Sequence, residues 1–295
     1  MNEISILIPT YNDVCTELVT ALAKQARAIK GLTFEILVAD DGSTDPQVVS
    51  KNKAVGEIEG CDILFMKKNV GRAVIRNYLA RQSRYKQLLF VDADMTIIDD
   101  CFLKHYLDHA FDGIVYGGYV AKGDDSGNLR WNYERACADK HTAEERRKHP
   151  YLHFHTSNFM IPREVMMAHP LDERFRYYGY EDVFYGKELR RAGIEIRHIN
   201  NPVGFLRFES NADFVKKTEE GLRTLNMFQL ELSEYSTLLK AMARLRQIRL
   251  SWLPRLIYRK WGEHMKANLY STRPSLKVFQ LYKLCYFAAF KAQKD

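Results

Sequence analysis

Apolar runs of strand length alternate with segments of helical periodicity over the first third of the chain. Between the first two runs, Leu18, Leu22 and Ala26 recur four residues apart, which predicts a helix over residues 13–29 with Asp13 as its N-cap. Strands that alternate with helices and are apolar throughout predict a parallel sheet with helices on both faces. The predicted strands are Ile4–Ile8, Phe34–Ala39, Cys61–Met66 and Gln87–Val91.

The middle of the chain is less regular. Ile114–Tyr119 is typical of a strand, with a close backbone approach at the Gly117-Gly118 pair. The charged segment Glu134–His149 predicts an exposed helix. The further elements expected are a strand within Tyr151–Ile161, a helix over Val183–Ala192 with Gly193 as its C-cap, and a strand over Ile194–Ile199.

Helical periodicity dominates after Asn211. Apolar residues recur every three or four positions from Phe214 to Tyr235, which predicts an amphipathic helix. From Leu238 onward, basic residues interleave with leucine, isoleucine and tryptophan. We therefore expect a helical, basic extension over residues 211–295.

Composition narrows the class of protein. Hydrophobic residues at 46% and charged residues at 27% are ordinary for a globular chain of 295 residues. No apolar run approaches the roughly 18 to 20 residues that span a bilayer, and Met1–Ile4 lacks the features of a signal peptide. Five dispersed cysteines without metal-binding spacing favour reduced thiols. The expected location is the cytoplasm.

Charge is distributed unevenly along the chain. The net charge is +7, but from Lys240 to Asp295 thirteen Lys or Arg face two acidic residues, a net +11 that leaves −4 for the preceding 239 residues. Such a basic end with interleaved aromatic residues suits an anionic membrane surface, which predicts a peripheral position on the inner face of the cell membrane. A helical lid or a homodimer surface is the alternative, and no recognition motif supports a nucleic-acid partner.

Polar clusters follow three of the predicted strands, at residues 9–12, 40–45 and 92–94. In sheets of this kind, ligands lie beyond the carboxyl ends of the strands. Asp92 and Asp94 are two residues apart on an extended chain, so their side chains can converge. Converging carboxylates suit Mg²⁺, with substrate phosphates and water filling its remaining positions. The alternative is that the two residues only end a strand and begin a turn.

Five motifs follow one another along the chain: Ile8–Asn12, Val38–Asp45, Asn69–Gly71 followed by Arg76–Asn77, Phe90–Asp94 and Gly179–Asp182. In order and spacing they resemble the motifs of the family 2 inverting glycosyltransferases of the GT-A fold. The resemblance covers residues 3 to 210 and implies an α/β, Rossmann-like, mainly parallel sheet flanked by helices. It implies a catalytic domain over residues 1–210, with a nucleotide-sugar half over 1–95 and an acceptor half over 96–210.

The resemblance implies a nucleotide-sugar donor site at the ends of the first strands. An acid of the second motif accepts a hydrogen bond from the base, usually uracil, with Asp41 as the first candidate and Asp40 as the second. The alternative is a plain turn in which Ser43, Thr44 or Asp45 caps the next helix. The donor-binding residues implied are Pro9, Thr10, Tyr11, Asn12, Asp40, Asp41, Asn69, Gly71, Arg72, Arg76, Asp92 and Ala93.

Arg72 and Arg76 lie one turn apart on the helix that begins after Gly71. The free backbone N–H groups and the dipole of that helix favour anions, so both guanidinium groups can face the donor diphosphate. The alternative for either arginine is a solvated helix face.

The fifth motif supplies the catalytic acids in the resembling enzymes. Asp182 is implied as the general base that deprotonates the acceptor hydroxyl, and Glu181 as a ligand of acceptor or sugar hydroxyls. The alternative is that both acids only complement the positive end of a helix. Asn158 and Tyr180 are the implied acceptor or sugar contacts. His153 and His155 can reach a metal or phosphate, although a satisfied histidine is the commoner case.

The resemblance also implies Mg²⁺ or Mn²⁺ held by Asp92 and Asp94 against the donor diphosphate. Many relatives add a histidine after the next strand, but Phe205 stands there in this chain. His198 can replace that histidine, Arg207 can offer a fixed charge to the phosphates, or the metal has fewer ligands.

The function implied is transfer of a sugar from a nucleotide-diphosphate sugar, foremost a UDP-sugar, to a hydroxyl of a glycan or lipid-linked acceptor in polysaccharide biosynthesis. A sugar-nucleotide pyrophosphorylase would need a glycine-rich phosphate loop after the first strand, and Pro9–Asn12 is not such a loop. The remaining alternative is a catalytically silent nucleotide-sugar sensor or membrane-docked scaffold.

Overall fold

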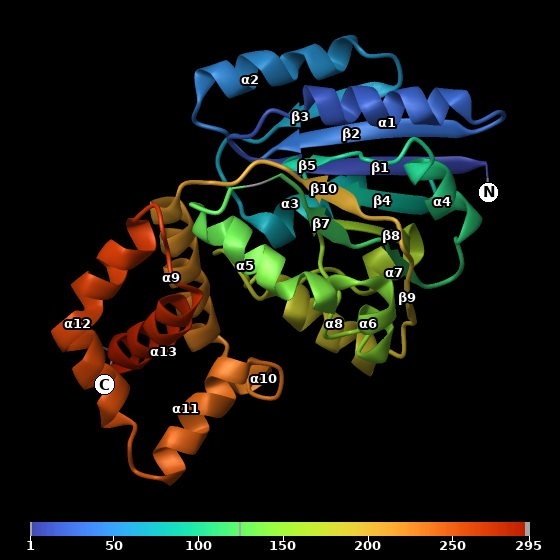
Figure 1. The fold of residues 1–295 in the computed structure, drawn as a ribbon. Coiled ribbons are helices and arrows are strands. Elements are labelled where there is room, and N and C mark those ends of the chain that lie inside the picture. The colour runs from blue at the N-terminus through green and yellow to red at the C-terminus, as the bar shows by residue number, and fades with distance from the viewer. Residues whose placement is uncertain (1, 124, 293–295) are drawn as a thin grey trace. The chain divides into compact units, whose positions relative to one another are not determined.

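The computed structural model describes residues 2–123 and 125–292, which form two compact units (Figure 1). The first unit comprises the chain up to Lys122 together with Ala138–Arg176 and Glu181–Arg207. The second comprises the chain from Phe208 onward together with Gly123–Cys137 and Tyr177–Tyr180. These two short segments lie within the expected catalytic domain in the sequence, yet they belong to the helical unit in space.

A seven-stranded sheet forms the centre of the first unit, with strand order β3-β2-β1-β4-β8-β6-β9. Strand β8 runs antiparallel to β4 and β6, and the other neighbouring pairs are parallel. The chain goes from β1 to β2 on one side and returns to β4 on the other, so a topological switch point lies between β1 and β4. The strands are β1 Glu3–Thr10, β2 Thr33–Asp40, β3 Cys61–Phe65, β4 Gln87–Val91, β6 Ile114–Tyr116, β8 Asn158–Pro162 and β9 Ile196–His198.

A second sheet of three short strands has the order β5-β10-β7. It consists of β5 (Met95–Thr96), β10 (Val203–Phe205) and β7 (Tyr119–Ala121). The expected strand over residues 114–119 is therefore divided between two sheets. Gly118 has a φ of +87°, and this left-handed backbone turns the chain between β6 and β7.

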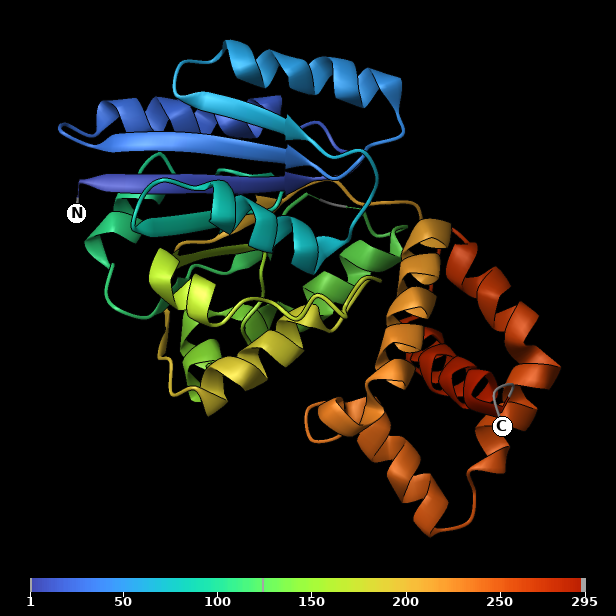
Figure 2. The same ribbon diagram turned by 180° about the vertical axis from the view of Figure 1, so that it is seen from behind.

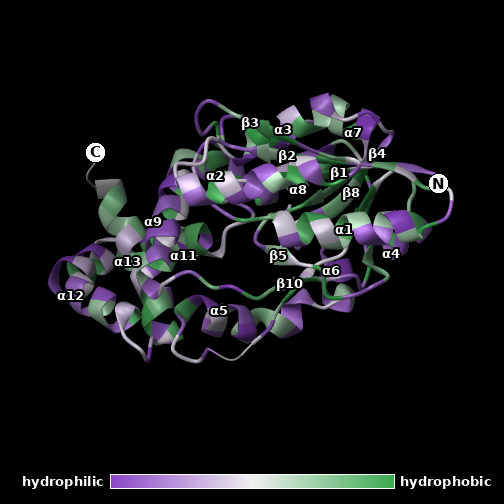
Figure 3. Ribbon diagram, turned by 90° about the horizontal axis from the view of Figure 1, so that it is seen from above, coloured by the Kyte–Doolittle hydropathy of each residue, from purple (hydrophilic) through white to green (hydrophobic). Residues whose placement is uncertain are grey.

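Helices cover both faces of the large sheet, as the pattern predicts. One core cluster joins the sheet to α1 (Thr16–Ala28) and α4 (Phe102–Asp108). The other joins it to α3 (Arg72–Gln82), α7 (Arg163–Ala168) and α8 (Glu181–Arg191). Figure 3 shows the central strands coloured mainly as hydrophobic. Near β3 lie α2 (Pro46–Lys53) and a 3₁₀ turn, η1 (Ala54–Glu57).

Two local predictions are wrong. Cys15, not Asp13, occupies the N-cap position of α1, and no side chain caps that end. The charged segment 134–149 is not one exposed helix: it falls into the end of α5 (Leu129–Cys137), η2 (Ala138–His141) and α6 (Ala143–Lys148). Glu134 and Arg146 are buried within it, because each finds polar or aromatic partners inside its own unit.

The second unit is helical. Helix α9 ends at Met227 because the backbone of Phe228 leaves the helical region, so the expected helix over residues 214–235 is interrupted. Helices α12 and α13 pack against each other (Figures 1 and 2). Within the described part of the chain, no helix combines the length and apolar character that crossing a membrane requires. The helices are α9 Asn211–Met227, α10 Gln229–Leu232, α11 Thr237–Gln247, α12 Trp252–Tyr270 and α13 Leu276–Ala292, with α5 beside them.

Candidate active site

The loops after β1 and β2 are tied together by Asn12. Its side-chain carbonyl accepts from the backbone amides of Thr44 (2.8 Å) and Asp45 (3.1 Å), and its backbone amide donates to Ser43 Oγ (2.8 Å). Asn12 adopts a φ of +52°, a left-handed conformation that asparagine tolerates better than most residues. Asp45 caps α2, as the sequence allows. Asn12 therefore shapes the loops on which the neighbouring donor candidates stand.

Asp41 holds the segment that begins α3. Its two carboxylate oxygens accept from the backbone amides of Val70 (2.8 Å) and Gly71 (3.0 Å). Burial raises the pKa of Asp41, while these two hydrogen bonds oppose the rise. Gly71 has a φ of +94°, and a Cβ there would lie 2.8 Å from the carbonyl oxygen of Arg176. Both oxygens of the first candidate for base recognition are thus engaged with the backbone.

Asp40, the second candidate, uses only one of its two carboxylate oxygens in a hydrogen bond within the described structure. Its Oδ1 accepts from the backbone amide of Ser43 at 2.7 Å, whereas Oδ2 is buried and has no hydrogen-bond partner in the described structure. Leaving a buried carboxylate oxygen unsatisfied is costly, so such an atom is a candidate for bonding to a ligand. The geometry therefore favours Asp40 over Asp41 as an acceptor for a nucleobase N–H.

A chain of charged contacts begins at the end of β4. The buried guanidinium of Arg76 donates to Asp92, and its Nη1 also donates to the backbone oxygen of Arg72 at 3.2 Å. Arg72 in turn forms an ion pair with Glu181, with 3.6 Å between Nη1 and Oε1. Arg76 is only 2% exposed, so it is not on the solvated helix face that was its alternative. These contacts connect β4, α3 and the start of α8.

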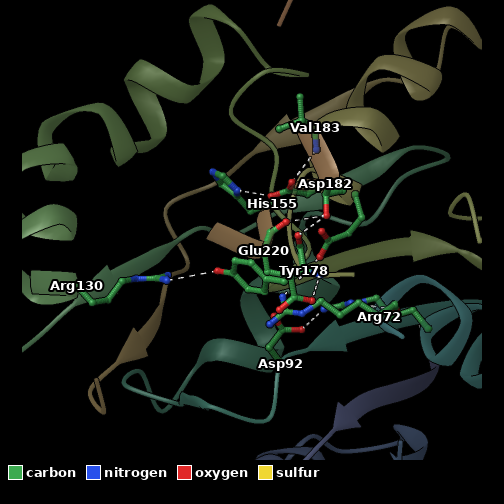
Figure 4. Close-up of polar contacts among 11 residues, drawn as sticks. Arg72, Asp92, Arg130, His155, Tyr178, Asp182, Val183 and Glu220 are labelled. Atoms are coloured by element: carbon green, nitrogen blue, oxygen red, sulfur yellow. Dashed lines mark hydrogen bonds and ion pairs between the residues drawn. The ribbon is translucent and has the colours of Figure 1, made fainter. Parts of the chain in front are cut away.

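Asp182 lies next in the chain and pairs with His155. Nδ1 of His155 lies 2.7 Å from Oδ2 of Asp182, and the backbone amide of Val183 donates to Oδ1 at 2.8 Å. Figure 4 shows the imidazole directed at the carboxylate. The His155 ring also stacks on His141 with centroids 5.9 Å apart. This packing fixes the orientation of the imidazole and hence of the carboxylate it binds.

The two adjacent acids are driven in opposite directions. Burial raises the pKa of Glu181, and the repulsion of Asp182 adds to that effect, against the attraction of Arg72. Burial pushes the pKa of Asp182 up as well, but the hydrogen bond and charge of His155 overcome it and hold this pKa below its usual range. Neighbouring carboxyl groups with pKa values pushed apart are suited to different roles at one site.

The predicted acceptor contacts and the other donor candidates lie in varied environments. Asn158 is fully buried, and its side-chain amide bonds to Tyr106, Gly117 and Gly118, so its role as an acceptor contact stays a prediction. Tyr180 belongs to the second unit and has a φ of +69°. The remaining donor candidates vary in exposure: Tyr11 and Asn69 are exposed, Pro9 is half-buried, and Thr10 and Ala93 are buried.

The two proposed replacements for the missing histidine ligand have other partners. Nε2 of His198 lies 2.9 Å from the carbonyl oxygen of Pro150, and the side chain is buried. Arg207 contacts Asp13, with 3.1 Å between Nη2 and Oδ1. Phe205 is buried in β10. Among the described residues, no group of three His, Cys, Asp or Glu is placed to hold a metal.

Asp92 and Asp94 nevertheless have the right chemistry for a hard cation. Both are carboxylates, both are partly exposed at the carboxyl end of β4, and Asp92 is 17% exposed despite its bond to Arg76. Mg²⁺ and similar ions are often held by one or two carboxylates, with phosphate oxygens and water completing the shell. The pair therefore fits a divalent cation that arrives with a diphosphate.

The pairing of His155 with Asp182 is the contact that sequence reasoning missed. The two residues are 27 positions apart, and His155 was singled out only for a metal or phosphate. The sequence did indicate that both residues lie near the carboxyl end of the sheet, since one precedes a central strand and the other begins a helix. Their spacing in the sequence does not indicate that they pair with each other.

The mostly parallel sheet, with polar loops at its carboxyl edge, is the architecture of a GT-A glycosyltransferase, and comparison with known proteins gives the family. The model described as Glycosyl transferase family 2 matches residues 5–169, more than half of the chain, so the chain belongs to this family. An uncharacterized glycosyltransferase of Rickettsia conorii is 34% identical over 94 residues, which are 31% of this chain but only 15% of that protein. The predicted family is confirmed.

Solved glycosyltransferases share the fold at low sequence identity. S. aureus TarS 1-349 has a TM-score of 0.53 and 17% identity, with 100% of this chain and 92% of that chain covered. The same TarS fragment was solved with UDP-GlcNAc, with a TM-score of 0.52, 16% identity and the same coverage. Mannosyltransferase PcManGT from Pyrobaculum calidifontis, solved with GDP-Man and Mn²⁺, has a TM-score of 0.51 and 14% identity, with 99% and 86% covered. The predicted α/β fold of the GT-A type is confirmed.

Proposed function

We propose that this chain is an inverting glycosyltransferase that moves a sugar from a nucleotide-diphosphate sugar, first of all a UDP-sugar, to a hydroxyl of a glycan or lipid-linked acceptor. Family membership and the TarS structures with UDP and UDP-GlcNAc support this choice of donor. The observation that carries the proposal is the chain of contacts from Asp92 through Arg76 and Arg72 to Glu181, the residue that directly precedes Asp182. It joins the proposed diphosphate end of the site to the proposed base.

In this mechanism Asp182 takes the proton from the acceptor hydroxyl. The hydroxyl oxygen attacks the anomeric carbon from the face opposite the departing nucleoside diphosphate, so the configuration is inverted. Asp182 is suited to this role because His155 orients its carboxylate and keeps it ionised. Glu181 accepts hydrogen bonds from hydroxyls of the acceptor or the sugar.

The donor end of the site depends on other groups. Oδ2 of Asp40 accepts the N–H of the base, and the loops held by Asn12 and Asp41 enclose the nucleoside. Arg72 and Arg76 provide positive charge beside the diphosphate. Mg²⁺ or Mn²⁺ held by Asp92 and Asp94 would stabilise the charge of the leaving group, a chemistry common among GT-A enzymes.

Calorimetric titration with UDP, GDP and dTDP, each with and without Mn²⁺, tests the donor site. Tight, metal-dependent binding of UDP that is lost in Asp92→Asn and Asp94→Asn supports it. Absence of metal-dependent binding to any of the three nucleotides contradicts the mechanism. It would favour the sensor or scaffold function, which agrees with the finding that the described residues contain no group of three metal-ligating side chains.

The proposed base is tested by turnover of the UDP-sugar that binds best. Asp182→Asn should lower kcat by about 10²- to 10⁴-fold, the usual contribution of a general base, and should leave UDP affinity unchanged. Glu188→Gln, an exposed change on the same helix, is the matched control and should retain full activity.

His155→Ala tests whether the histidine tunes the base. In a plot of kcat/KM against pH, this variant should lose activity on the acid side at a higher pH than the original chain, because burial still raises the pKa of Asp182 when His155 is gone. Loss of activity at the same pH in both proteins would show that His155 does not tune the base.

A further inference from the structure

The second unit contains a long stretch of chain without negative charge. Between Glu234 and Glu263 there are seven Lys or Arg and no acidic residue. The stretch covers α11, the bend after it and the first half of α12. A charge run of this kind is often only a solvated surface, so the apolar residues within it decide whether it has a partner.

Large apolar side chains are exposed at the bend between α11 and α12. Ile248 is 61% exposed, Leu250 is 37% exposed and Trp252 is 52% exposed. In Figures 1 and 2 this bend lies away from helices α9 and α13. Contiguous exposed apolar residues are uncommon on soluble proteins and mark surfaces that meet a partner or a membrane.

The bend is a defined structure that holds these side chains outward. The backbone amide of Leu250 donates to the oxygen of Leu245 (2.8 Å), and that of Arg249 donates to the oxygen of Arg246 (3.0 Å). These are the two bonds of a Schellman motif, with Arg249 at its left-handed position with a φ of +58°. Glycine is the usual residue there, because a side chain is strained in this conformation.

The first turns of α12 continue the same surface. Trp252, Arg255 and Leu256 are exposed and lie three or four residues apart, so they share one face. Pro254, Met265 and Leu269 are buried on the other face. The exposed face thus combines an indole, an aliphatic side chain and guanidinium groups, the combination found where a helix lies in the interface of an anionic bilayer.

We propose that this face docks onto an anionic membrane surface. We call it the α11–α12 surface, and it consists of Ile248, Arg249, Leu250, Trp252, Arg255 and Leu256. Insertion of the apolar groups at the bend supplies the hydrophobic part of the affinity, and the surrounding cations attract acidic headgroups. The stretch has no acidic residue to complement the cations of a second copy, which disfavours a self-complementary interface. The exposed aliphatic side chains Ile248 and Leu250 disfavour nucleic acid as the partner, because its backbone presents charged phosphates and offers them no apolar surface.

Flotation of the full chain with lipid vesicles tests the proposal. Vesicles of phosphatidylcholine with about one third phosphatidylglycerol should bind the protein at least tenfold better than vesicles of phosphatidylcholine alone, and high salt should weaken this binding. Equal binding to both vesicles, or none to either, overturns the proposal.

Two variants identify the residues responsible. Trp252→Ala should reduce vesicle binding about tenfold, because an interfacial anchor is lost. Arg249→Gly should reduce it about fivefold through one lost charge, while the melting temperature stays equal or rises, since glycine suits the left-handed position. A retained melting temperature separates lost docking from lost folding.

Leu230→Ala is the matched control, because Leu230 is 91% exposed in the same unit but lies beside Glu231 rather than cations. It should leave vesicle binding unchanged. If Leu230→Ala reduces binding as much as Trp252→Ala, the assigned surface is wrong. The proposal is also wrong if Trp252→Ala leaves vesicle binding unchanged but abolishes a homodimer detected by light scattering. The same holds if it leaves vesicle binding unchanged but abolishes binding of a labelled oligonucleotide.

Discussion

The carboxylates of this site show how much the environment of a residue decides. Asp40 and Asp41 are adjacent and chemically identical. Both oxygens of Asp41 accept hydrogen bonds from backbone amides, whereas Asp40 has one buried oxygen without a hydrogen-bond partner in the described structure. Glu181 and Asp182 are likewise adjacent, and their pKa values move in opposite directions. A residue's role follows from its partners, which its type does not reveal.

This difference predicts separate effects of two isosteric substitutions. Asp41→Asn should cost about 1–3 kcal/mol of unfolding free energy, because an amide NH₂ group would face a backbone N–H. Asp40→Asn keeps the oxygen that accepts from Ser43, so stability should change little, but affinity for UDP should fall about 10- to 100-fold. Urea unfolding and calorimetry measure the two effects. If Asp41→Asn instead lowers affinity at unchanged stability, the assignment of the base-binding acid is reversed.

Sequence reasoning proposed the residues of the candidate site but not the contacts among them. The motifs bring out Asp92, Glu181 and Asp182, because paired acids after a strand or at a helix start are visible in a linear chain. The burial of Arg76 and the bond from His155 to Asp182 depend on which strands become neighbours. Asn158 resembled a ligand contact, yet it satisfies buried groups around Gly117.

At the scale of elements, the loop after β2 requires glycine in two separate ways. Gly42 has a φ of +73°, and a Cβ there would lie 2.5 Å from the backbone carbon of Lys68. The loop therefore packs directly against the segment that leads to α3. Its conformation and its packing are both needed to hold Asp41 against the amides of Val70 and Gly71.

Gly42→Ala should therefore destabilise the chain more than an ordinary substitution of a left-handed glycine. Gly31→Ala is the matched control, because Gly31 has a φ of +78° but nothing lies within 4 Å of its would-be Cβ. Gly31→Ala should cost about 1–2 kcal/mol from backbone strain alone, and Gly42→Ala should cost clearly more. Equal costs in urea unfolding would show that the loop can move away from Lys68.

Elements with strong local signals were predictable, and those that depend on distant partners were not. The apolar runs of β1, β2 and β4 are buried on both faces, so their type is evident from composition alone. The three-residue strand β10 exists because β5 and β7 lie beside it, and Val203–Phe205 carries no pattern of its own. The same limit explains the division of residues 114–119 between two sheets.

At the scale of the whole molecule, linear order does not match spatial grouping. Gly123–Cys137 and Tyr177–Tyr180 join the helical unit although they interrupt the catalytic domain expected from the sequence. Arg130 illustrates the reason: it pairs with Glu134 on its own helix and lies over the ring of Phe214 on α9. Such partners 84 positions apart are invisible to periodicity. The extent of the functional domain stays a prediction.

The stability of the molecule should fall as the pH drops from about 6.5 to about 4, partly through one histidine. Burial lowers the pKa of His198 from 6.5 to about 4, so the folded chain keeps this ring neutral while the unfolded chain protonates it. The unfolded state then binds more protons, and the stability present above pH 6.5 is lost progressively on acidification.

His198→Gln isolates this contribution. Glutamine can still donate to the oxygen of Pro150 but does not titrate, and it loses the edge contact of the imidazole with Tyr116. The variant should be less stable than the original chain at pH 7.5. The difference in unfolding free energy should narrow by pH 5, because only the original chain loses stability by keeping a histidine neutral in the folded state. Urea midpoints at several pH values measure both curves. Parallel curves would mean that His198 is protonated in the folded chain without loss, and that its burial does not govern the acid response.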